Sequence, residues 1–326
     1  MPKYVAVIVL ALCSVLASRA DVSAEFLAGL GPNLPKDFLT KVNGFQDDFS
    51  AYAPTGDPAV ATAELAAGGW NWVSYSGSGN NLAVLSTTLP ANSAITTTDG
   101  RPVLHLGNGP GHINGSDNHL IYQPSDPGLN YTGDYQQVLM RAKVTNLTTL
   151  TGGTETAIYR LHGGVSLRVN PANSSGVDLV FAKYGGSSQT RYYGVGYGNS
   201  WAPGYSFGSD TWDVNKWYWL RMDYYHDDAD NKDKVRVKTW LSGTEEPDEW
   251  TFYPALPTGF ASSPGGWAGI AASCGGGLQF DVDYFLVKAD SLPDITVGMP
   301  NIPEPATITL LALGGLTLWR RQGKRM

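Results

Sequence analysis

Two runs of alternating apolar and polar residues flank a charged turn between Trp217 and Trp250. In the first run the apolar side chains recur at every second position, at Tyr218, Leu220, Met222 and Tyr224. In the second run the same period relates Val235, Val237 and Thr239, with cationic residues between them. A period of two with aromatic and β-branched residues is typical of half-buried antiparallel strands. The pattern therefore predicts a β-hairpin whose acidic loop lies at residues 227–231.

Similar patterns predict an all-β domain over residues 44–290. Its other expected strands are 44–50, 103–106, 138–144, 156–162, 166–169, 178–183, 266–271 and 280–288. Residues 51–100 predict long loops with short strands, residues 107–130 a loop-rich stretch, and residues 192–207 a Gly/Tyr/Trp loop. A lead-in segment (21–43) precedes the domain and a linker (291–300) follows it. Many short strands joined by Gly-rich turns indicate a sandwich or barrel.

The chain begins with a segment typical of export signals. Lys3 precedes an almost wholly apolar run, and Ser18-Arg19-Ala20 supplies small residues at the usual cleavage positions. The apolar run is shorter than the ~20 residues that cross a bilayer. We interpret residues 1–20 as a secretory signal peptide; a buried N-terminal helix is the alternative.

The last residues form a second sorting segment. Pro303, Glu304 and Pro305 precede an apolar run (306–319), which is followed by a basic cluster (320–325). This order of a Pro-Glu-Pro element, a hydrophobic helix and basic residues, over 301–326, resembles the PEP-CTERM sorting signal of Gram-negative bacteria. The resemblance implies processing by an exosortase-type membrane protease and a location in the cell envelope, at the surface or in the extracellular matrix. An ordinary C-terminal transmembrane anchor is the alternative.

Charge and cysteine content exclude further classes. The chain has a formal net charge of −7 and no basic patch, so nucleic acid is not an expected partner. Its two cysteines are Cys13, which lies in the signal segment, and Cys274. The exported part therefore has no intrachain disulfide, and its stability must come from the packed core.

The order of the expected strands resembles the concanavalin A-like lectin/glucanase jelly roll. The stretches that carry the resemblance are 46–50 (QDDFS), 216–221 (KWYWLR), 235–240 (VRVKTW) and 280–285 (FDVDYF). The resemblance implies an all-β jelly-roll sandwich of two antiparallel sheets. This fold carries lectins, glycosidases, lyases and adhesion modules, so function must be argued from a site.

Two enzyme classes of this fold give testable expectations. The glucanases use a Glu-x-Asp-x-x-Glu strand, which is absent here, and Glu246-Pro247 predicts a turn instead. Jelly-roll polysaccharide lyases use an arginine with histidine and tyrosine, for which Arg160, His162 and Tyr193 are the candidates. Arg160 and His162 are two positions apart and so share a face of the expected strand; a sugar-contacting or solvated surface is the alternative role for them.

Asp283 is the most informative acid. The residues around it are apolar on both faces of the expected strand, and an ionised carboxylate there needs a partner. In related jelly rolls a Ca²⁺ ion ties the first strand to the last, which would make Asp48 and Asp283 structural calcium ligands. Hydrogen bonds from backbone amides, or a pairing with Arg or Lys, are the alternatives.

Aromatic residues provide the candidate glycan site. Trp201, Tyr205 and Trp212 cluster in a Gly-rich segment, where exposed rings could stack on sugars; covering the core is their alternative role. His112, Asp117 and His119 could bind zinc, but their spacing is more typical of a Gly/Asn-rich surface loop. The leading hypothesis is an exported, non-catalytic jelly roll that binds a polysaccharide. A polysaccharide lyase or hydrolase and a purely structural matrix protein are the alternatives.

Overall fold

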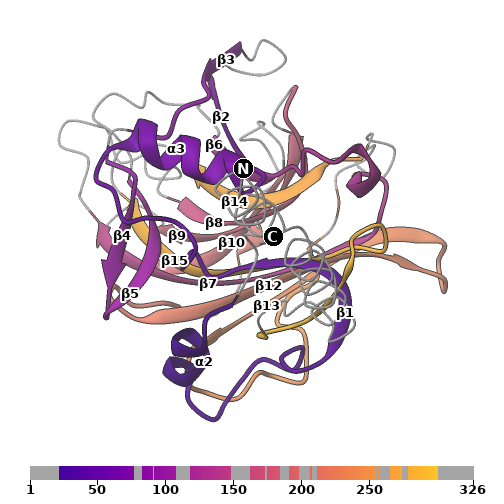
Figure 1. The fold of residues 1–326 in the computed structure, drawn as a ribbon. Coiled ribbons are helices and arrows are strands. Elements are labelled where there is room, and N and C mark those ends of the chain that lie inside the picture. Colours follow the sequence, from indigo (N-terminus) through magenta and orange to yellow (C-terminus); the bar gives the residue numbers. More distant parts are fainter. Residues whose placement is uncertain are drawn as a thin grey trace, which may run out of the picture.

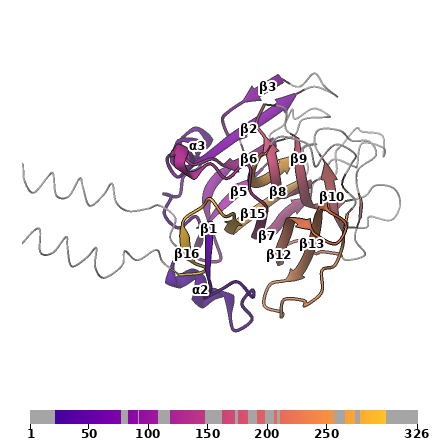
Figure 2. The same cartoon turned by 90° about the vertical axis from the view of Figure 1, so that its right-hand side faces the viewer.

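The chain folds into a sandwich of two antiparallel sheets. The computed structural model describes residues 22–76, 83–90, 92–107, 118–147, 162–172, 175–183, 191–197, 206–207, 211–254, 256, 265–273 and 278–299. The first sheet has the strand order β13-β12-β7-β15-β1-β16, and β5 with its partner β4 also pairs with β15. The second sheet has the order β11-β10-β9-β8-β14-β6-β2-β3. Figures 1 and 2 show the two sheets as separate layers, which confirms the expected jelly-roll sandwich.

The first sheet contains the first and the last strand of the described chain. Its strands are β1 (Lys41–Asp47), β4 (Ala94–Thr98), β5 (Arg101–Leu106), β7 (Gln136–Leu147), β12 (Trp217–Asp227), β13 (Lys232–Leu241), β15 (Leu278–Lys288) and β16 (Asp294–Thr296). Strands β12 and β13 form the predicted hairpin, with Asp227 opposite Lys232 at its end.

The second sheet is built from the middle of the chain. Its strands are β2 (Trp70–Ser76), β3 (Ala83–Ser86), β6 (Asn118–Tyr122), β8 (His162–Asn170), β9 (Ser175–Lys183), β10 (Arg191–Tyr197), β11 (Ser206–Phe207) and β14 (Trp267–Ser273). The helices are α2 (Ala24–Leu30), α3 (Pro58–Ala67) and a 3₁₀ turn at Pro127–Leu129. None of these described helices has the length and apolar content needed to cross a bilayer.

The main core lies between the sheets and follows the alternation of the sequence. On β12 the predicted apolar face, represented by Leu220 and Met222, is fully buried in this core. The facing strands of the second sheet contribute Leu179 and Phe181. Burial of apolar surface between two sheets is the main stabilising contribution in such a fold.

A second apolar cluster lies on the opposite face of the first sheet. Helix α2 and the following turn place Phe26 and Phe38 against Trp219 and Tyr284. Ser23 caps α2 by accepting a hydrogen bond from the backbone N–H of Phe26 at 3.1 Å. Figure 1 shows α2 below the first sheet, on the side away from the second sheet. The lead-in segment is therefore an integral part of the domain.

The segment expected as a linker also belongs to the fold. Strand β16 pairs with β1, with Val42 opposite Ile295, and Ile295 and Val297 are buried in the second cluster.

Other differences concern the ends and types of elements. Strand β1 begins at Lys41 rather than at residue 44, and α3 lies where loops and strands were expected. Strands β10 and β11 overlap the stretch 192–207, which was expected to be a loop. The pattern did not identify these strands, because a Gly/Tyr-rich strand has no clear apolar alternation.

A β-bulge at Asp283 changes the expected faces of β15. Val282 is opposite Ala142, but Tyr284 is opposite Arg141, so Asp283 is an extra residue between them. Before the bulge Val282 faces the main core, and after it Tyr284 faces the second cluster. The sequence pattern had assigned Val282 and Tyr284 to one face, and the inserted residue is the physical reason for the correction.

Candidate functional site

Asp283 is paired with two arginines. Its Oδ2 accepts from Arg141 Nη1 at 2.7 Å and lies 3.1 Å from Arg101 Nη2. Burial raises the pKa of Asp283 to about 6, although both guanidinium groups oppose that rise. Pairing with arginine is one of the alternatives that the sequence left open, and it is the arrangement observed.

Asp48 has partners of its own, all from the main chain and from one hydroxyl. Its Oδ2 accepts from the backbone N–H of Ser23 at 2.7 Å, and its Oδ1 accepts from the backbone N–H of Ser50 at 3.0 Å. The described residues contain no group of three or more His, Cys, Asp or Glu side chains that could hold a metal ion. Two guanidinium groups beside Asp283 supply the positive charge that its carboxylate needs, and a calcium ion bound by Asp48 and Asp283 stays a prediction.

The structure describes the residues of the lyase alternative only in part. Tyr193 lies in the main core, 5% exposed, with its ring 5.6 Å from that of Phe181. Its neighbour Tyr192 is opposite Ala182 on β9, and His162 is opposite the same residue from the other side. Tyr193 is therefore an inward-facing residue of β10, whereas the sequence had assigned it to a loop. Arg160 lies outside the described residues.

The outer face of the second sheet carries a buried histidine–aspartate pair. His119 Nε2 lies 3.2 Å from Asp178 Oδ1, although β14 and β8 separate their strands. Small residues lie next to each partner on the intervening strands, with Ala271 opposite His119 and Ser166 opposite Asp178. Both side chains are buried, so the pair is a polar crosslink and not an open surface. His119 therefore lies in a strand, not in the expected surface loop.

The predicted aromatic glycan site is not formed by Trp212. Its ring is 1% exposed, packs edge-on against Phe181 at 5.4 Å, and donates from Nε1 to the carbonyl of Tyr192. Trp212 therefore covers the core, which is the alternative role considered for it. Trp201 and Tyr205 lie outside the described residues, as do His112, Asp117 and the sorting residues Pro303, Glu304 and Pro305.

Glu246, in the turn after β13, is held by cations. Its Oε1 lies 2.7 Å from Lys238 Nζ, its Oε2 accepts from Arg221 Nη2 at 3.0 Å, and it is 4% exposed. The expected turn is present, since β13 ends at Leu241 and residues 242–251 contain no strand. A carboxylate fixed by two cations is suited to fastening the turn to the sheet, and not to proton transfer.

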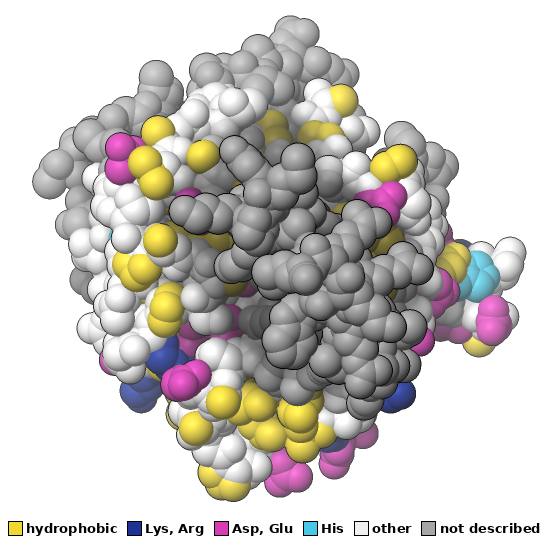
Figure 3. All heavy atoms as spheres, viewed as in Figure 1, with side chains coloured by type: hydrophobic (Ala, Val, Ile, Leu, Met, Phe, Trp, Pro, Cys, Tyr) yellow, Lys and Arg dark blue, Asp and Glu magenta, His cyan; other side chains and the backbone are white. Residues whose placement is uncertain are grey.

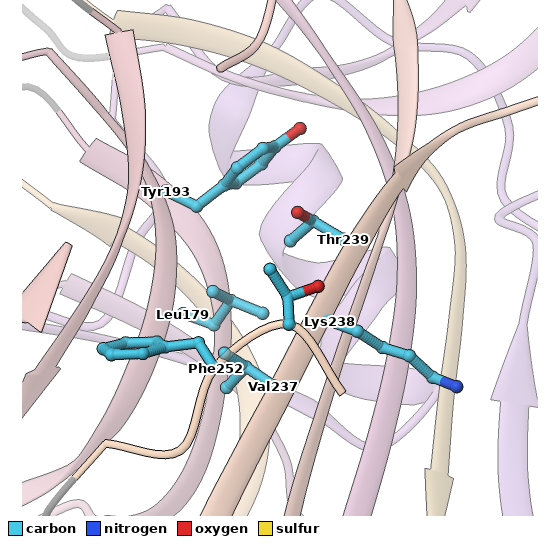
Figure 4. A pocket seen from close by; sticks show the side chains of 7 residues that line it. Leu179, Tyr193, Val237, Lys238, Thr239 and Phe252 are labelled. Atoms are coloured by element: carbon cyan, nitrogen blue, oxygen red, sulfur yellow. The ribbon is translucent and has the colours of Figure 1, made fainter. Parts of the chain in front are cut away.

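A small cavity lies at one edge of the main core. It is lined by Leu179 and Tyr193 of the second sheet and by Val237 and Thr239 of the first, and Phe252 closes it. Figure 4 shows these side chains converging, whereas Lys238 points away. The cavity holds about 10 Å³, which is at the limit for one water molecule. It is a packing defect, too small for a sugar.

An open cleft lies at one end of the first sheet, and we call it the tyrosine cleft. It has a volume of about 270 Å³, close to the lower end of the usual ~300–1,000 Å³ range of ligand sites. It is lined by Val42, Asn43, Tyr135, Gln136, Gln137, Asp223, Tyr224, Tyr225, Lys288, Ala289 and Asp290. Rings, amides and carboxylates thus meet in one open depression, a combination that suits a hydroxyl-rich ligand.

Tyr135 supplies the exposed ring of the tyrosine cleft. Its side chain is 48% exposed, and its hydroxyl donates to Asp233 Oδ1 at 3.0 Å. Asp233 also accepts from the Tyr224 hydroxyl at 2.7 Å and contacts His226 Nδ1 at 2.9 Å. Burial alone would raise the pKa of Asp233, but its three partners outweigh this effect and lower it. The exposed ring is therefore held in place by a carboxylate that stays ionised.

A row of polar residues crosses the floor of the cleft. Register places Lys288, Gln137 and Asp223 side by side on β15, β7 and β12. Asp223 accepts from Arg236 Nε at 2.7 Å, and Lys288 Nζ donates to Asp37 Oδ1 at 3.0 Å. Asp223 and Lys288 at this floor thus each have a partner of opposite sign.

Sequence reasoning missed the tyrosine cleft. Asp223 and Tyr225 follow from the alternation of β12, but Tyr135 precedes a strand in a segment without a pattern. Its supporting partner Asp233 is 98 residues away in the chain. The pairing of β7 with β12, together with that of β12 with β13, brings the two together, and no local signal in the sequence reports the pairing of β7 with β12.

Comparisons with known proteins reveal likeness in fold only. No protein-family model matches the sequence, and the search of curated proteins found no match. Among solved structures, a bifunctional GH43-CE protein of Bacteroides eggerthii is similar with a TM-score of 0.40 and 13% identity, covering 74% of this chain and 25% of that one. This chain thus spans about a quarter of that protein's length.

Two further solved structures have similar TM-scores. The β-glucanase of Bacillus licheniformis has a TM-score of 0.37 and 13% identity, covering 76% of this chain and 98% of that one. The exoplasmic/lumenal domain of VIP36, in a form bound to Ca²⁺ and Man2, has a TM-score of 0.35 and 14% identity, covering 71% and 85%.

Proposed function

We propose that this chain is an exported, non-catalytic jelly-roll protein that binds a glycan in the tyrosine cleft. The observation that carries the proposal is the exposed ring of Tyr135, fixed by Asp233 at the mouth of an open cleft. Aromatic rings bind the apolar faces of sugars, and a rigid ring does so at a small cost in conformational entropy. Gln137 and Asn43 also line the cleft and would supply amide groups for sugar hydroxyls.

The charges of the cleft support binding rather than catalysis. A general acid or base needs a carboxyl group that can exchange a proton near neutral pH. Asp223 is bound by Arg236, and Asp37 is bound by Lys288 and Arg221. Burial would raise the pKa of Asp37, but these two cations lower it overall. Asp37 is therefore kept ionised and is not suited to donate a proton to a glycosidic oxygen.

The proposed location rests on the two ends of the sequence. Residues 1–20 would direct export, and the PEP-CTERM-like tail at 301–326 would retain the protein in the envelope or matrix after exosortase-type processing. N-terminal sequencing of the cell-associated protein should begin near Asp21. Replacing Glu304 should leave a longer form in the inner membrane; unchanged mass and location would reduce the tail to an ordinary anchor.

Affinity electrophoresis with immobilised polysaccharides tests the binding proposal. The purified protein should be retarded by at least one of a panel of β-glucans, mannans and alginates, without releasing new reducing ends or unsaturated products. Tyr135→Ala should abolish the retardation. Tyr253→Ala is the matched control, because Tyr253 is 58% exposed but lies outside the cleft. Product release, or equal retardation of both variants, would contradict a non-catalytic site at Tyr135.

A further inference from the structure

Leu39 is unfavourably placed in two respects. It has a φ of 64°, in the left-handed region that bulky side chains rarely adopt, and its side chain is 61% exposed. Glycine or asparagine would relieve the backbone strain, and either would remove an apolar surface from water. Strain that persists at an exposed apolar residue points to a contact that the isolated domain lacks.

Leu39 lies beside the point where the described chain ends. Its backbone N–H donates to the carbonyl of Val297 at 2.9 Å, and the N–H of Val297 donates back to Thr40. Two residues later Met299 is 39% exposed, and Leu27 and Leu34 are partly exposed at the same cluster. We call Leu39, Met299, Leu27 and Leu34 the α2-end patch. In Figure 3 hydrophobic side chains gather at this lower end of the molecule, where Figure 1 places α2.

The sequence beyond Met299 identifies what would cover this patch. The apolar run of the tail begins at Ala306, only seven residues after Met299. Seven fully extended residues span at most about 25 Å, so a tail inserted in a bilayer holds Met299 within that distance of the lipid. An exposed apolar patch at a tethered end of a domain is suited to an interfacial contact with lipid.

We propose that the α2-end patch rests on the bilayer into which the tail inserts, and that it orients the domain with α3 directed away from the lipid. Figures 1 and 2 show α2 at the lower end of the molecule and α3 in its upper half. The four residues of the patch are apolar, and the nearby Lys36 is paired with Asp248. This inference rests on the proposed insertion of the tail, applies to the form that still carries the tail before processing, and adds a contact surface that is separate from the tyrosine cleft.

Depth-dependent quenching in vesicles tests the orientation. The full chain, with both native cysteines changed to serine, carries a fluorophore either at Thr40→Cys beside the patch or at Val60→Cys on α3. Val60 is a matched control for the patch residue Leu39, because it is likewise an exposed apolar residue, with 46% of its surface exposed. In phosphatidylcholine vesicles with nitroxide-labelled lipid, the label at residue 40 should be quenched several-fold more than the label at residue 60. Equal quenching at the two sites would overturn the proposal.

A substitution at Leu39 separates membrane contact from stability. Leu39→Asn should relieve the backbone strain and raise the melting temperature of the protein in solution. In the Thr40→Cys background it should also reduce quenching at residue 40. A lower melting temperature would show that Leu39 is needed for the fold, and unchanged quenching would show that it does not touch lipid; either result contradicts the proposal. Resistance of the protein to carbonate extraction reports tail insertion independently, so failure of the anchor is distinguished from failure of the patch.

Discussion

Asp47 provides a test of how the domain balances burial against hydrogen bonding. Its carboxylate is 1% exposed and accepts three hydrogen bonds: from the backbone N–H of Phe49 at 2.7 Å, the hydroxyl of Tyr52 at 2.7 Å and the Nε1 of Trp70 at 2.8 Å. Burial raises the pKa of Asp47 to about 7, and the three donors oppose the rise without cancelling it. These bonds fasten the end of β1 to β2 across the core.

The raised pKa makes the stability of the fold depend on pH. The folded protein holds the Asp47 proton up to about pH 7, whereas the unfolded chain releases it near the ordinary value of 3.8. The folded state therefore binds more protons over this range, and its stability falls as the pH rises from about 4 to 7. A rise of about three pH units corresponds to about 4 kcal/mol, at about 1.4 kcal/mol per unit. This is an upper estimate for one group.

Asp47→Asn isolates this contribution. The amide is neutral at every pH, so the free energy of unfolding of the wild type minus that of the variant should fall by up to about 4 kcal/mol between pH 4 and pH 7.5. Urea unfolding followed by tryptophan fluorescence measures both proteins at each pH. Asp290→Asn, at an exposed position, controls for the loss of one charge. A difference that stays constant with pH would show that the three donors keep Asp47 ionised, and would refute the reasoning.

Three further changes test other parts of the structure. Tyr131→Phe should lower the free energy of unfolding by about 1–3 kcal/mol, because its buried hydroxyl bonds the Tyr122 carbonyl and the Ala268 N–H; the exposed Tyr253→Phe should change it by less than ~0.5 kcal/mol in urea titrations. Arg141→Gln should cost up to about 3–5 kcal/mol by leaving Asp283 with Arg101 alone, and millimolar Ca²⁺ should not restore the melting temperature; restoration would revive the calcium site. Asp233→Asn should weaken glycan binding without abolishing it, since only the support of Tyr135 is lost; unchanged affinity in titration calorimetry would exclude that support.

The alternation of the sequence predicted the faces of individual strands well. Strands β7 and β12 bury the residues that the pattern assigned to the core, because a half-buried strand with a period of two has only one stable orientation. The order of strands within each sheet was not predictable in the same way. It depends on pairings such as β1 with β15, whose residues are more than 230 positions apart.

Local irregularities account for the misassigned residues. The bulge at Asp283 shifts Tyr284 to the second cluster, and a strict period of two contains no sign of an inserted residue. Tyr193 was assigned to a loop, whereas it is an inward-facing residue of β10. Asp283 was correctly identified as an acid that needs compensation, but the identity of its partner depended on Arg101 and Arg141, which only the fold brings to it.

The tyrosine cleft shows the same limit for function. Tyr225 could be placed on the outer face of β12 from the alternation, but the exposed ring of Tyr135 and its anchor Asp233 come from separate segments. The ring and the carboxylate are too far apart in the chain to form a short sequence motif with a fixed spacing. Its recognition required the register between β7 and β12.

The dissociation constant of the protein for its retarding polysaccharide, compared among the wild type, Tyr135→Phe and Tyr135→Ala, tests the central claim most directly. A ring that acts as a stacking platform is retained in phenylalanine and lost in alanine. Stacking contributes on the order of 1 kcal/mol beyond the area that it buries, so the account predicts at least about a tenfold weakening for Tyr135→Ala. It also predicts a change of less than about threefold for Tyr135→Phe, because about 0.6 kcal/mol corresponds to that factor. Equal dissociation constants for all three proteins, in calorimetric titrations at one temperature and salt concentration, would contradict glycan binding at the tyrosine cleft.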